Sequence, residues 1–482
     1  MSIQYVGWCR DLRYGYLRGF PAESVAPNGM TFAWTPDLTA VFAEQIHCIW
    51  RSTMRVTHIN SYDSAGGAAR AAYRLHAGLI SLGHESILLV QHKETDDNTV
   101  LQFGPPLDVL SRLRRIVKGR LLPYSRRPLK SRPAGSTYMS DDRSEHNGDV
   151  LRQVPSSDVL NLHWVAGSFE YISFFRKVPP NLPIVWTLHD MNPFTGGCHF
   201  DGGCGKFNEH CGACPQMCSS QLDDFSAHVW KRKNEAFASV GANMMQVVAP
   251  SRWLAAEAKK SSLFGRLPVT VIPYGLETDR FQPRDRRRAR QLFEIPSEAK
   301  VVLFVADWAN EKRKGLDLLM EAMRGLGDLP SLYVFAVGRN VNSQVLGVRS
   351  KTINYVRDDL TLSFVYSAAD VFVVPSLEDN LPLTALEALA CGIPTIAFSV
   401  GGLPDIVREG RTGLLTPLGD VGALRRAIAE LLRNIERRAS MAQECRRVAL
   451  QEYSLDVQAR RYVTLYEELA GKSRSSGTVI MN

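Results

Sequence analysis

Hydrophobic residues in this chain occur in short continuous runs, which are separated by polar turns and by helical patterns. Apolar runs of this length are typical of strands that are buried in a parallel sheet. The repeated order of strand, loop and helix predicts a doubly wound α/β sheet. In the first half of the chain the predicted strands are residues 55–59, 86–90, 159–162, 184–188, 245–249 and 269–272.

A second series of strands follows a stretch that contains proline and glycine. Its predicted strands are residues 301–305, 332–337, 352–355, 371–374 and 395–398. We interpret residues 273–283 as an interdomain linker. Two Rossmann-like domains are therefore expected, at 54–272 and 284–470, with a ligand cleft at the carboxyl ends of their strands.

Three segments do not follow this alternation. Residues from about 92 to 155 are polar, basic and interrupted by proline, and we predict an insertion there. The tail, 471–482, is predicted to be disordered. Residues 1–53 show no clear period and precede Met54. They are either a mispredicted extension, with Met54 as the true start, or an additional arm, and we favour the first interpretation.

The overall composition is that of a globular protein. The 482 residues are 45% hydrophobic and 22% charged, which fits two or three domains. No apolar run approaches the roughly 18 residues that a membrane span needs, and the first residues are too polar for a secretory signal. Nine cysteines in a chain of this length do not make a disulfide framework, so a cytoplasmic location is expected.

Positive charge is concentrated in one segment of this chain, whose formal net charge is +8. Basic residues crowd 112–132 with almost no acids, and leucine, isoleucine and valine are interleaved among them. We expect this element to lie on an anionic membrane surface, with about 1 kcal/mol from each basic residue. A solvated loop is the alternative. Nucleic acid is not expected as a partner, because no stacking aromatics or nucleic-acid motif accompany the charges.

The segment from Pro375 to Glu387 is the most informative part of the chain. An apolar strand ends there at a turn that carries Asp379, and a helix is predicted to begin at about Pro382. The free N–H groups of the first helical turn form an anion site. Glu387 follows on the same side of the helix as Thr384. Two carboxylates around bare amides suit a nucleotide sugar, and a capped helix on a sheet is the alternative.

Candidate ligand groups in the first half also follow strands. Gly66 and Gly67 stand between a strand and a helix, where glycine lets the backbone approach a ligand. A tight turn is the alternative. His189 follows a strand at its cleft end, and a neutral imidazole there can bond a sugar hydroxyl or position an acceptor. The alternative for His189 is a histidine with a purely structural role.

Arg313 and Lys314 precede Gly315 at a predicted helix start. Transfer from a nucleoside diphosphate sugar leaves negative charge on the departing diphosphate. A fixed cation and helix amides stabilise that charge without a metal. No Asp-x-Asp pair follows a strand to bind a metal–diphosphate, so we expect no cofactor for the chemistry. A solvated helix start is the alternative interpretation.

A cysteine-rich loop occupies residues 198–218. Cys211 and Cys214 are separated by two residues, a spacing that is common in zinc sites. With Cys198 and Cys204 they would complete a tetrahedral structural zinc site that constrains the loop. Free thiols and disulfides are the alternatives.

Several segments resemble, in order, the retaining glycosyltransferases of family four, which have GT-B architecture. They are Ala65-Gly-Gly-Ala, Thr187-Leu-His-Asp, Ala249-Pro-Ser-Arg-Trp-Leu, Val271-Ile-Pro-Tyr-Gly-Leu, Arg313-Lys-Gly, Pro375-Ser, Ala388-Leu-Ala-Cys-Gly and Val400-Gly-Gly-Leu-Pro-Asp. The resemblance runs from about residue 54 to 469. Bacterial exopolysaccharide transferases of the colanic-acid type also share the cysteine-rich loop.

The resemblance implies transfer of a hexose, with retention, from a nucleoside diphosphate sugar to a glycan or a polyprenyl-linked acceptor. The place would be the inner face of the plasma membrane. Asp379 would touch the transferred sugar, Glu387 would bond the ribose hydroxyls, and His189 would lie near the reacting centre. The implied reacting-centre residues are His189, Asp379 and Lys314, and the implied donor-site residues are Gly66, Gly67, Arg313, Lys314, Asn380, Leu381, Thr384 and Glu387.

Two departures from the family pattern leave room for other functions. The family most often has glutamate where Asp379 stands, and it has an arginine near Trp308 that is missing here. We expect Arg313 to take the place of that arginine, although the role of Lys314 is the better supported of the two. A sugar-nucleotide epimerase of the same architecture and a non-catalytic binding subunit are the rival hypotheses, and donor turnover with an acceptor separates the three.

Overall fold

The computed structural model describes residues 23–25, 31–33, 53–104, 108–130, 132, 138–146, 148–240, 244–341 and 348–476. The chain divides into two units, Met1–Thr53 and Met54–Asn482. In the first unit, β1 (Glu23–Val25) pairs antiparallel with β2 (Thr31–Ala33). The rest of residues 1–52 lie outside the described residues, so both interpretations of this segment stay open.

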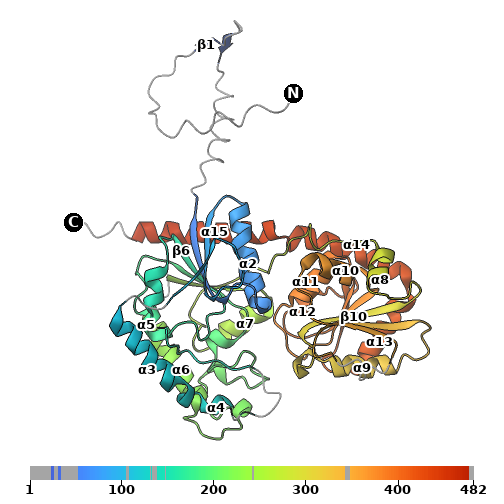
Figure 1. The fold of residues 1–482 in the computed structure, drawn as a ribbon, viewed down its shortest axis with the longest axis horizontal. Coiled ribbons are helices and arrows are strands. Elements are labelled where there is room, and N and C mark those ends of the chain that lie inside the picture. The colour runs from blue at the N-terminus through green and yellow to red at the C-terminus, as the bar shows by residue number, and fades with distance from the viewer. Residues whose placement is uncertain are drawn as a thin grey trace. The chain divides into compact units, whose positions relative to one another are not determined.

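The second unit contains two parallel α/β lobes (Figure 1). The sheet of the N lobe has seven strands in the order β5-β4-β3-β6-β7-β8-β9. These strands are β3 (Arg55–Tyr62), β4 (Glu85–His92), β5 (Val100–Gln102), β6 (Val159–Leu162), β7 (Ile184–Thr187), β8 (Met245–Ala249) and β9 (Val269–Val271). The continuous apolar runs are explained by burial, because β6 and β7 are buried along their whole length.

The sheet of the C lobe has six strands in the order β12-β11-β10-β13-β14-β15, again all parallel. They are β10 (Lys300–Trp308), β11 (Leu332–Arg339), β12 (Ser350–Ile353), β13 (Val371–Val374), β14 (Thr395–Phe398) and β15 (Gly413–Thr416). The two sheets confirm the predicted pair of Rossmann-like domains.

The α-helices lie around the two sheets (Figure 1). Those before the linker are α2 (Gly66–Ser81), α3 (Val109–Ser125), α4 (Arg127–Lys130), α5 (Tyr171–Phe175), α6 (Phe225–Ala238) and α7 (Arg252–Lys260). Those after it are α8 (Arg286–Leu292), α9 (Leu316–Arg324), α10 (Asp359–Ser367), α11 (Leu383–Ala390), α12 (Leu403–Ile406), α13 (Val421–Arg433), α14 (Ile435–Glu452) and α15 (Leu455–Ser476). No helix among these described residues is long and apolar enough to cross a membrane.

The last helix, α15, packs on the N lobe rather than the C lobe. Tyr462 and Tyr466 are fully buried in one cluster with Val56 and Leu79, and Asn161 donates to the Tyr466 hydroxyl at 2.7 Å. The prediction that residues up to 470 all belong to the second domain was therefore wrong, because an amphipathic pattern does not say which lobe the helix covers. The helix also continues through residues 471–476, where disorder was predicted, and residues 477–482 lie outside the described residues.

The predicted insertion at 92–155 is only partly irregular. Its residues 100–102 form β5, which pairs with β4 at the edge of the sheet, and α3 follows. The sequence prediction omitted β5 and β15, because their segments, Val100-Leu-Gln and Gly413-Leu-Leu-Thr, each contain only two adjacent apolar residues.

Candidate active site

A cleft of about 360 Å³ lies between the two lobes, and residues of both lobes line it. Every residue predicted for the donor site and the reacting centre borders this cleft: Gly66, Gly67, His189, Arg313, Lys314, Asp379, Asn380, Leu381, Thr384 and Glu387. The structure thus brings together residues that are separated by more than three hundred positions in the sequence.

An ion pair stands at the centre of the C-lobe wall. Lys314 lies in a short turn before α9, and its Nζ donates to Asp379 Oδ2 at 2.7 Å. Ser376 donates to the same carboxylate oxygen at 3.2 Å. Burial alone would raise the pKa of Asp379, but the charges of Lys314 and Arg313 hold that pKa below its ordinary value. Asp379 is therefore an anion that is already paired with Lys314, the cation predicted to bind the diphosphate.

Two glycines after β14 support the turn that carries Asp379. A Cβ atom on Gly401 would lie 1.7 Å from the Asp379 carbonyl oxygen, and one on Gly402 would lie 1.8 Å from the Asn380 carbonyl oxygen. Neither distance is compatible with a side chain. The Val400-Gly-Gly-Leu-Pro segment is therefore glycine-rich because the Asp379–Asn380 backbone rests directly on it.

The start of α11 faces the cleft. Pro382 is the N-cap residue, with φ −65° and ψ 124°, so the helix begins at Leu383, one residue later than predicted. The N–H groups of Leu383 and Thr384 precede the first bond of the helix, which Ala385 donates to the Pro382 carbonyl oxygen at 3.0 Å. Together with Lys314 they form the positive end of the cleft, which suits an anionic group such as a diphosphate.

Asn380 connects the two walls. Its Nδ2 donates to the His189 carbonyl oxygen at 3.1 Å, and its Oδ1 accepts from Ser251 Oγ at 2.7 Å. Ser251 is also the N-cap of α7. The Asn380 side chain is thus committed to holding the N lobe against the donor turn, and its main chain is what remains for a ligand.

Glu387 is buried and already has partners. Tyr366 donates to its Oε2 at 2.9 Å, and the guanidinium groups of Arg70 and Arg74 each lie 3.6 Å from its Oε1. Arg70 and Arg74 also pair with Asp359 of α10. A ribose at Glu387 would share the carboxylate with these arginines, which the sequence analysis missed although they stand four residues apart just after Gly66 and Gly67.

The imidazole of His189 has both of its nitrogens engaged within the protein. Nε2 lies 3.1 Å from His163 Nδ1, and Nδ1 lies 2.8 Å from the Tyr274 hydroxyl. Burial lowers the pKa of His189 to about 4. In this structure His189 is therefore a neutral ring fixed on the wall of the cleft, and a sugar hydroxyl would have to displace one of its partners.

Asp190, the next residue, organises the turn after β7. Its carboxylate accepts from Trp164 Nε1 at 2.9 Å and lies 2.6 Å from His199 Nδ1. The main-chain N–H of Asn192 donates to its other oxygen at 2.8 Å. These contacts give Asp190 a structural role at the edge of the cleft.

The remaining N-lobe element is the glycine turn at the start of α2. Gly66 has φ +84°, a left-handed conformation, with open space where a Cβ would stand. A Cβ on Gly67 would lie 4.0 Å from Leu383 Cδ1 of the C lobe. The turn therefore brings the N lobe close to the helix start that faces the cleft.

The aromatic rings of Trp308 and Tyr355 lie near the position where the family has the arginine that is missing here. Trp308 is 44% exposed, and Arg339 lies over its ring at 5.1 Å and over the ring of Tyr355 at 4.5 Å. Arg313 instead donates to the Glu378 carbonyl oxygen at 2.9 Å. The stacked group formed by Trp308, Arg339 and Tyr355 offers a flat surface beside the cleft, which sequence spacing alone did not reveal.

The cysteine-rich loop forms a small separate cavity beside the site. Cys198, Cys204, Cys211 and Cys214 all line it. The cysteines that the structure describes are free thiols, and burial raises the pKa of Cys211 to about 11. In the described parts of the chain, no three His, Cys, Asp or Glu side chains have the arrangement of a formed metal site. The zinc site stays a prediction.

Comparison with known families agrees with this architecture. Residues 65–280 match the family described as Glycosyltransferase Family 4, and residues 299–434 match Glycosyl transferases group 1. Two segments of the chain thus match glycosyltransferase families, and the fold is GT-B. The D-inositol 3-phosphate glycosyltransferases of Mycobacterium tuberculosis and Mycobacterium bovis are 34% identical over 187 residues. That match spans 36% of this chain and only 38% of their length.

Solved structures are similar in fold to this chain over most of its length. Sucrose-phosphate synthase from Thermosynechococcus elongatus has a TM-score of 0.59 at 20% identity, over 87% of this chain and 100% of that one. Anabaena HepE, solved in complex with UDP, has a TM-score of 0.57 at 16% identity, over 86% of this chain and 100% of that one. At such identities the likeness concerns the fold.

Proposed function

We propose that this protein transfers a hexose, with retention of configuration, from a nucleoside diphosphate sugar to a hydroxyl group. The observation that carries this proposal is the meeting of Lys314, Asp379 and the start of α11 in one interlobe cleft. A cation and bare amides at one place suit a departing diphosphate.

The residues have distinct roles in this reaction. The bond between the sugar anomeric carbon and the diphosphate oxygen breaks while the acceptor oxygen bonds the same face of the carbon. The departing diphosphate oxygen takes the proton of the acceptor hydroxyl. Lys314 and the α11 amides stabilise the charge on the diphosphate, and Arg313 adds positive charge beside them. Asp379 holds Lys314 in place and contacts the transferred sugar.

The donor proposal has support from a structural relative. HepE is described in complex with UDP and with UDP-glucose, so UDP-sugars are the first probes to use. In our proposal Glu387 contacts the ribose in competition with Arg70, and Asn380, Leu381 and Thr384 supply main-chain groups to the sugar and phosphate. Gly66 and Gly67 approach the donor from the N lobe.

The acceptor is, in this proposal, a glycan or polyprenyl-linked glycan at the inner face of a bacterial membrane, in exopolysaccharide biosynthesis. Helix α3 supports a membrane location, because it turns an apolar face to solvent. Its residues Val109, Leu110, Leu113, Ile116, Val117, Leu121 and Tyr124 are 52–70% exposed. Leu110, Leu113, Val117, Leu121 and Tyr124 follow helical spacing and share one face. We call these five residues the apolar strip.

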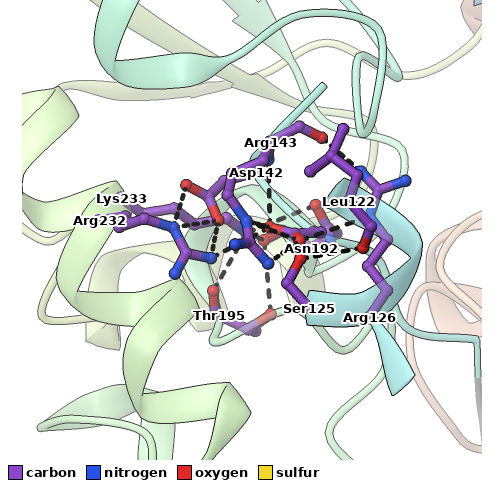
Figure 2. A network of polar contacts seen from close by, with 10 residues as sticks. Leu122, Ser125, Arg126, Asp142, Arg143, Asn192, Thr195, Arg232 and Lys233 are labelled. Carbon is purple, nitrogen blue, oxygen red and sulfur yellow. Dashed lines mark hydrogen bonds and ion pairs between the residues drawn. The ribbon is translucent and has the colours of Figure 1, made fainter. Parts of the chain in front are cut away.

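Two of the basic side chains of α3 tie the helix to the lobe, whereas Arg112 and Arg120 are exposed. Arg115 pairs with Glu145 at 3.3 Å, and Lys118 pairs with Glu170 at 3.0 Å. Arg126, just beyond the helix, reaches Asp141 at 3.4 Å within a network that includes Arg232 and Asp142 (Figure 2). The network fixes the end of α3 while the apolar strip stays outside.

The membrane contact we propose is therefore insertion of the apolar strip into an anionic bilayer, with Arg112, Arg120 and Arg127, which are exposed, at the headgroups. Replacing Leu110, Leu113, Val117 and Leu121 by glutamine should abolish sedimentation with anionic vesicles, because the apolar contact is lost. The matched control replaces Leu222, Leu292, Leu418 and Ile435, which are exposed apolar residues elsewhere. Equal sedimentation of both variants would contradict the proposal, and so would binding of neither variant nor wild type.

We retain structural zinc as a proposal for the four cysteines around the small cavity. The main-chain N–H of Gly196 donates to Cys211 Sγ at 3.1 Å. The buried amine of Lys233 interacts electrostatically with Cys198 and Cys211. Both features stabilise thiolates. Metal analysis of purified protein should give about one zinc per chain, which the Cys211→Ser variant should lose. Zinc-free protein with unchanged thermal stability under chelator would contradict this.

A screen of nucleoside diphosphate sugars tests the proposed function. A ligand at 100 times its dissociation constant adds about 2.7 kcal/mol of stability, so the correct donor should raise the melting temperature. A radiolabelled sugar should then move to a lipid-linked acceptor. An epimerase would instead release an altered nucleotide sugar without acceptor, and a binding subunit would show the thermal shift without turnover.

A further inference from the structure

Three histidines form a continuous hydrogen-bonded chain from the cleft into the N lobe. His189 Nε2 lies 3.1 Å from His163 Nδ1, and His163 Nε2 lies 2.9 Å from His58 Nδ1. His58 and His163 are buried. The residues belong to β3 and to the ends of β6 and β7, which are neighbours in the sheet, and His58 stands opposite Asn161 in register.

The chemistry of imidazole restricts this chain to two states. A neutral ring has one N–H donor and one acceptor nitrogen, whereas a protonated ring has two donors. Because each ring faces another ring, a hydrogen bond at both contacts requires all three rings to carry the proton on the same atom type. Either every Nδ1 is protonated or every Nε2 is protonated.

Both ends of the chain favour protonation at Nδ1. At the cleft end, the Tyr274 hydroxyl lies 3.4 Å from the Leu188 carbonyl oxygen, to which it can donate its proton while it accepts from His189 Nδ1 at 2.8 Å. At the inner end, His58 Nε2 is buried without a partner among the described residues. A buried acceptor without a partner is tolerated better than a buried N–H without one.

We propose that His58 and His163 are positioning residues, which fix the proton of His189 on Nδ1 and hold its ring against the cleft. His189 in turn stacks on Tyr274, at 15° between the rings, and its carbonyl oxygen accepts from Asn380. The chain therefore fixes the part of the N lobe that Asn380 of the donor turn contacts. The effect of the histidine chain on catalysis rests on the proposed glycosyl transfer. The protonation state of His189 does not depend on that proposal.

Burial keeps the three rings neutral, and the carboxylate of Asp190 beside His189 acts in the opposite direction. His76 of α2 lies near His58, with ring centroids 6.1 Å apart. Asp190 adjoins His189, and Asp379 and Tyr462 act on Tyr274. Burial, the largest effect, lowers the pKa of both His58 and His163 well below the ordinary value. The three rings are therefore uncharged at neutral pH.

Nuclear magnetic resonance reads the tautomer directly. Full-length protein labelled with ¹⁵N-histidine, with His189→Gln for assignment, should show protonated Nδ1 at His189 at pH 7. Free histidine prefers protonated Nε2, so this result is diagnostic. In His163→Phe the preference of His189 for protonated Nδ1 should weaken, because the contact with His163 is lost and only the contact with Tyr274 remains. Protonated Nε2 in the wild type, or an unchanged His189 in the variant, would overturn the inference even if no transfer activity is found.

Turnover tests the catalytic consequence separately. His163→Phe should lower kcat about tenfold to 100-fold through misplacement, with the donor KM within about threefold of wild type. His163→Gln should recover part of kcat, because an amide both donates and accepts. The matched control is His76→Gln, since His76 is equally buried but bonds Ser86 and Thr99. Wild-type kcat in His163→Phe, or an equal loss in the control, would contradict the positioning role.

Discussion

The two walls of the cleft are built from opposite kinds of chemistry. The C-lobe wall holds charges and bare amides, with Lys314 bonded to Asp379 beside the start of α11. The central part of the N-lobe wall is neutral, because His189 and Tyr274 bond each other and burial disfavours the charged form of both. A departing diphosphate needs fixed charge, whereas an acceptor hydroxyl needs a defined surface. In the proposed transfer, the charged C-lobe wall serves the donor diphosphate and the neutral N-lobe wall serves the acceptor hydroxyl.

Removing the support of the charged wall should have the largest effect. In Gly402→Ala the new Cβ would stand 1.8 Å from the Asn380 carbonyl oxygen and 2.6 Å from Ser251 Cβ. The donor turn must then move, and we expect a loss of transfer of about 1,000-fold or more. Gly327→Ala is the matched control, because nothing lies within 4 Å of its Cβ position. Similar activity of the two variants would show that the turn does not depend on Gly402.

Removing the positive charge of Lys314 should reduce transfer activity slightly less than the Gly402 substitution does. Lys314→Met should lower kcat/KM about 100-fold to 1,000-fold, because the charge on the departing diphosphate loses its partner. Lys312→Met, an exposed neighbour in the same turn, is the control for general effects on charge.

The Lys314→Met variant also leaves Asp379 buried without its partner. The double variant Lys314→Met/Asp379→Asn should recover thermal stability but not activity. Recovery of activity in the double variant would mean that the lysine serves only to neutralise Asp379.

The histidines of the neutral wall should make the stability of the protein depend on pH. The folded-state pKa of His189 is lowered to about 4 by burial, whereas an unfolded histidine titrates near 6.5. Between these values the unfolded chain binds more protons. The free energy of unfolding should therefore fall with decreasing pH by about 1.4 kcal/mol per pH unit for each neutral histidine.

Urea unfolding between pH 5 and pH 7 measures this dependence. His58 and His163 add to it in the wild type, because their pKa values are also lowered. His163→Gln should show a shallower slope, by about one proton. Identical slopes in wild type and variant would mean that His163 is not held neutral by the fold.

The sequence predicted the charged wall far better than the neutral one. Lys314, Asp379 and Glu387 stand in short contiguous motifs, in which a strand end, a turn and a helix start can be read directly. The chain of His58, His163 and His189 is spread over more than a hundred residues, and its members meet only because β3, β6 and β7 are neighbours in the sheet. Strand order follows from packing, which spacing does not reveal.

The fold shows the same limit. The two parallel sheets follow from the repeated apolar runs. The placement of α15 on the N lobe does not, because Tyr462 and Tyr466 give the helix an apolar face without saying which lobe covers it. Helix α3 was predicted to be basic and amphipathic, but only the structure shows Arg115 and Lys118 paired inward while Leu113 is exposed.

Calorimetry of nucleotide binding tests the central claim most directly, namely that the charged wall binds a diphosphate. The nucleoside diphosphate that stabilises the protein best would be compared with its monophosphate, in wild type and in Lys314→Met. We predict that the wild type binds the diphosphate at least about tenfold more tightly, a difference of about 1.4 kcal/mol, and that the variant loses this preference. Equal affinities in the wild type, or an unchanged preference in the variant, would contradict the account.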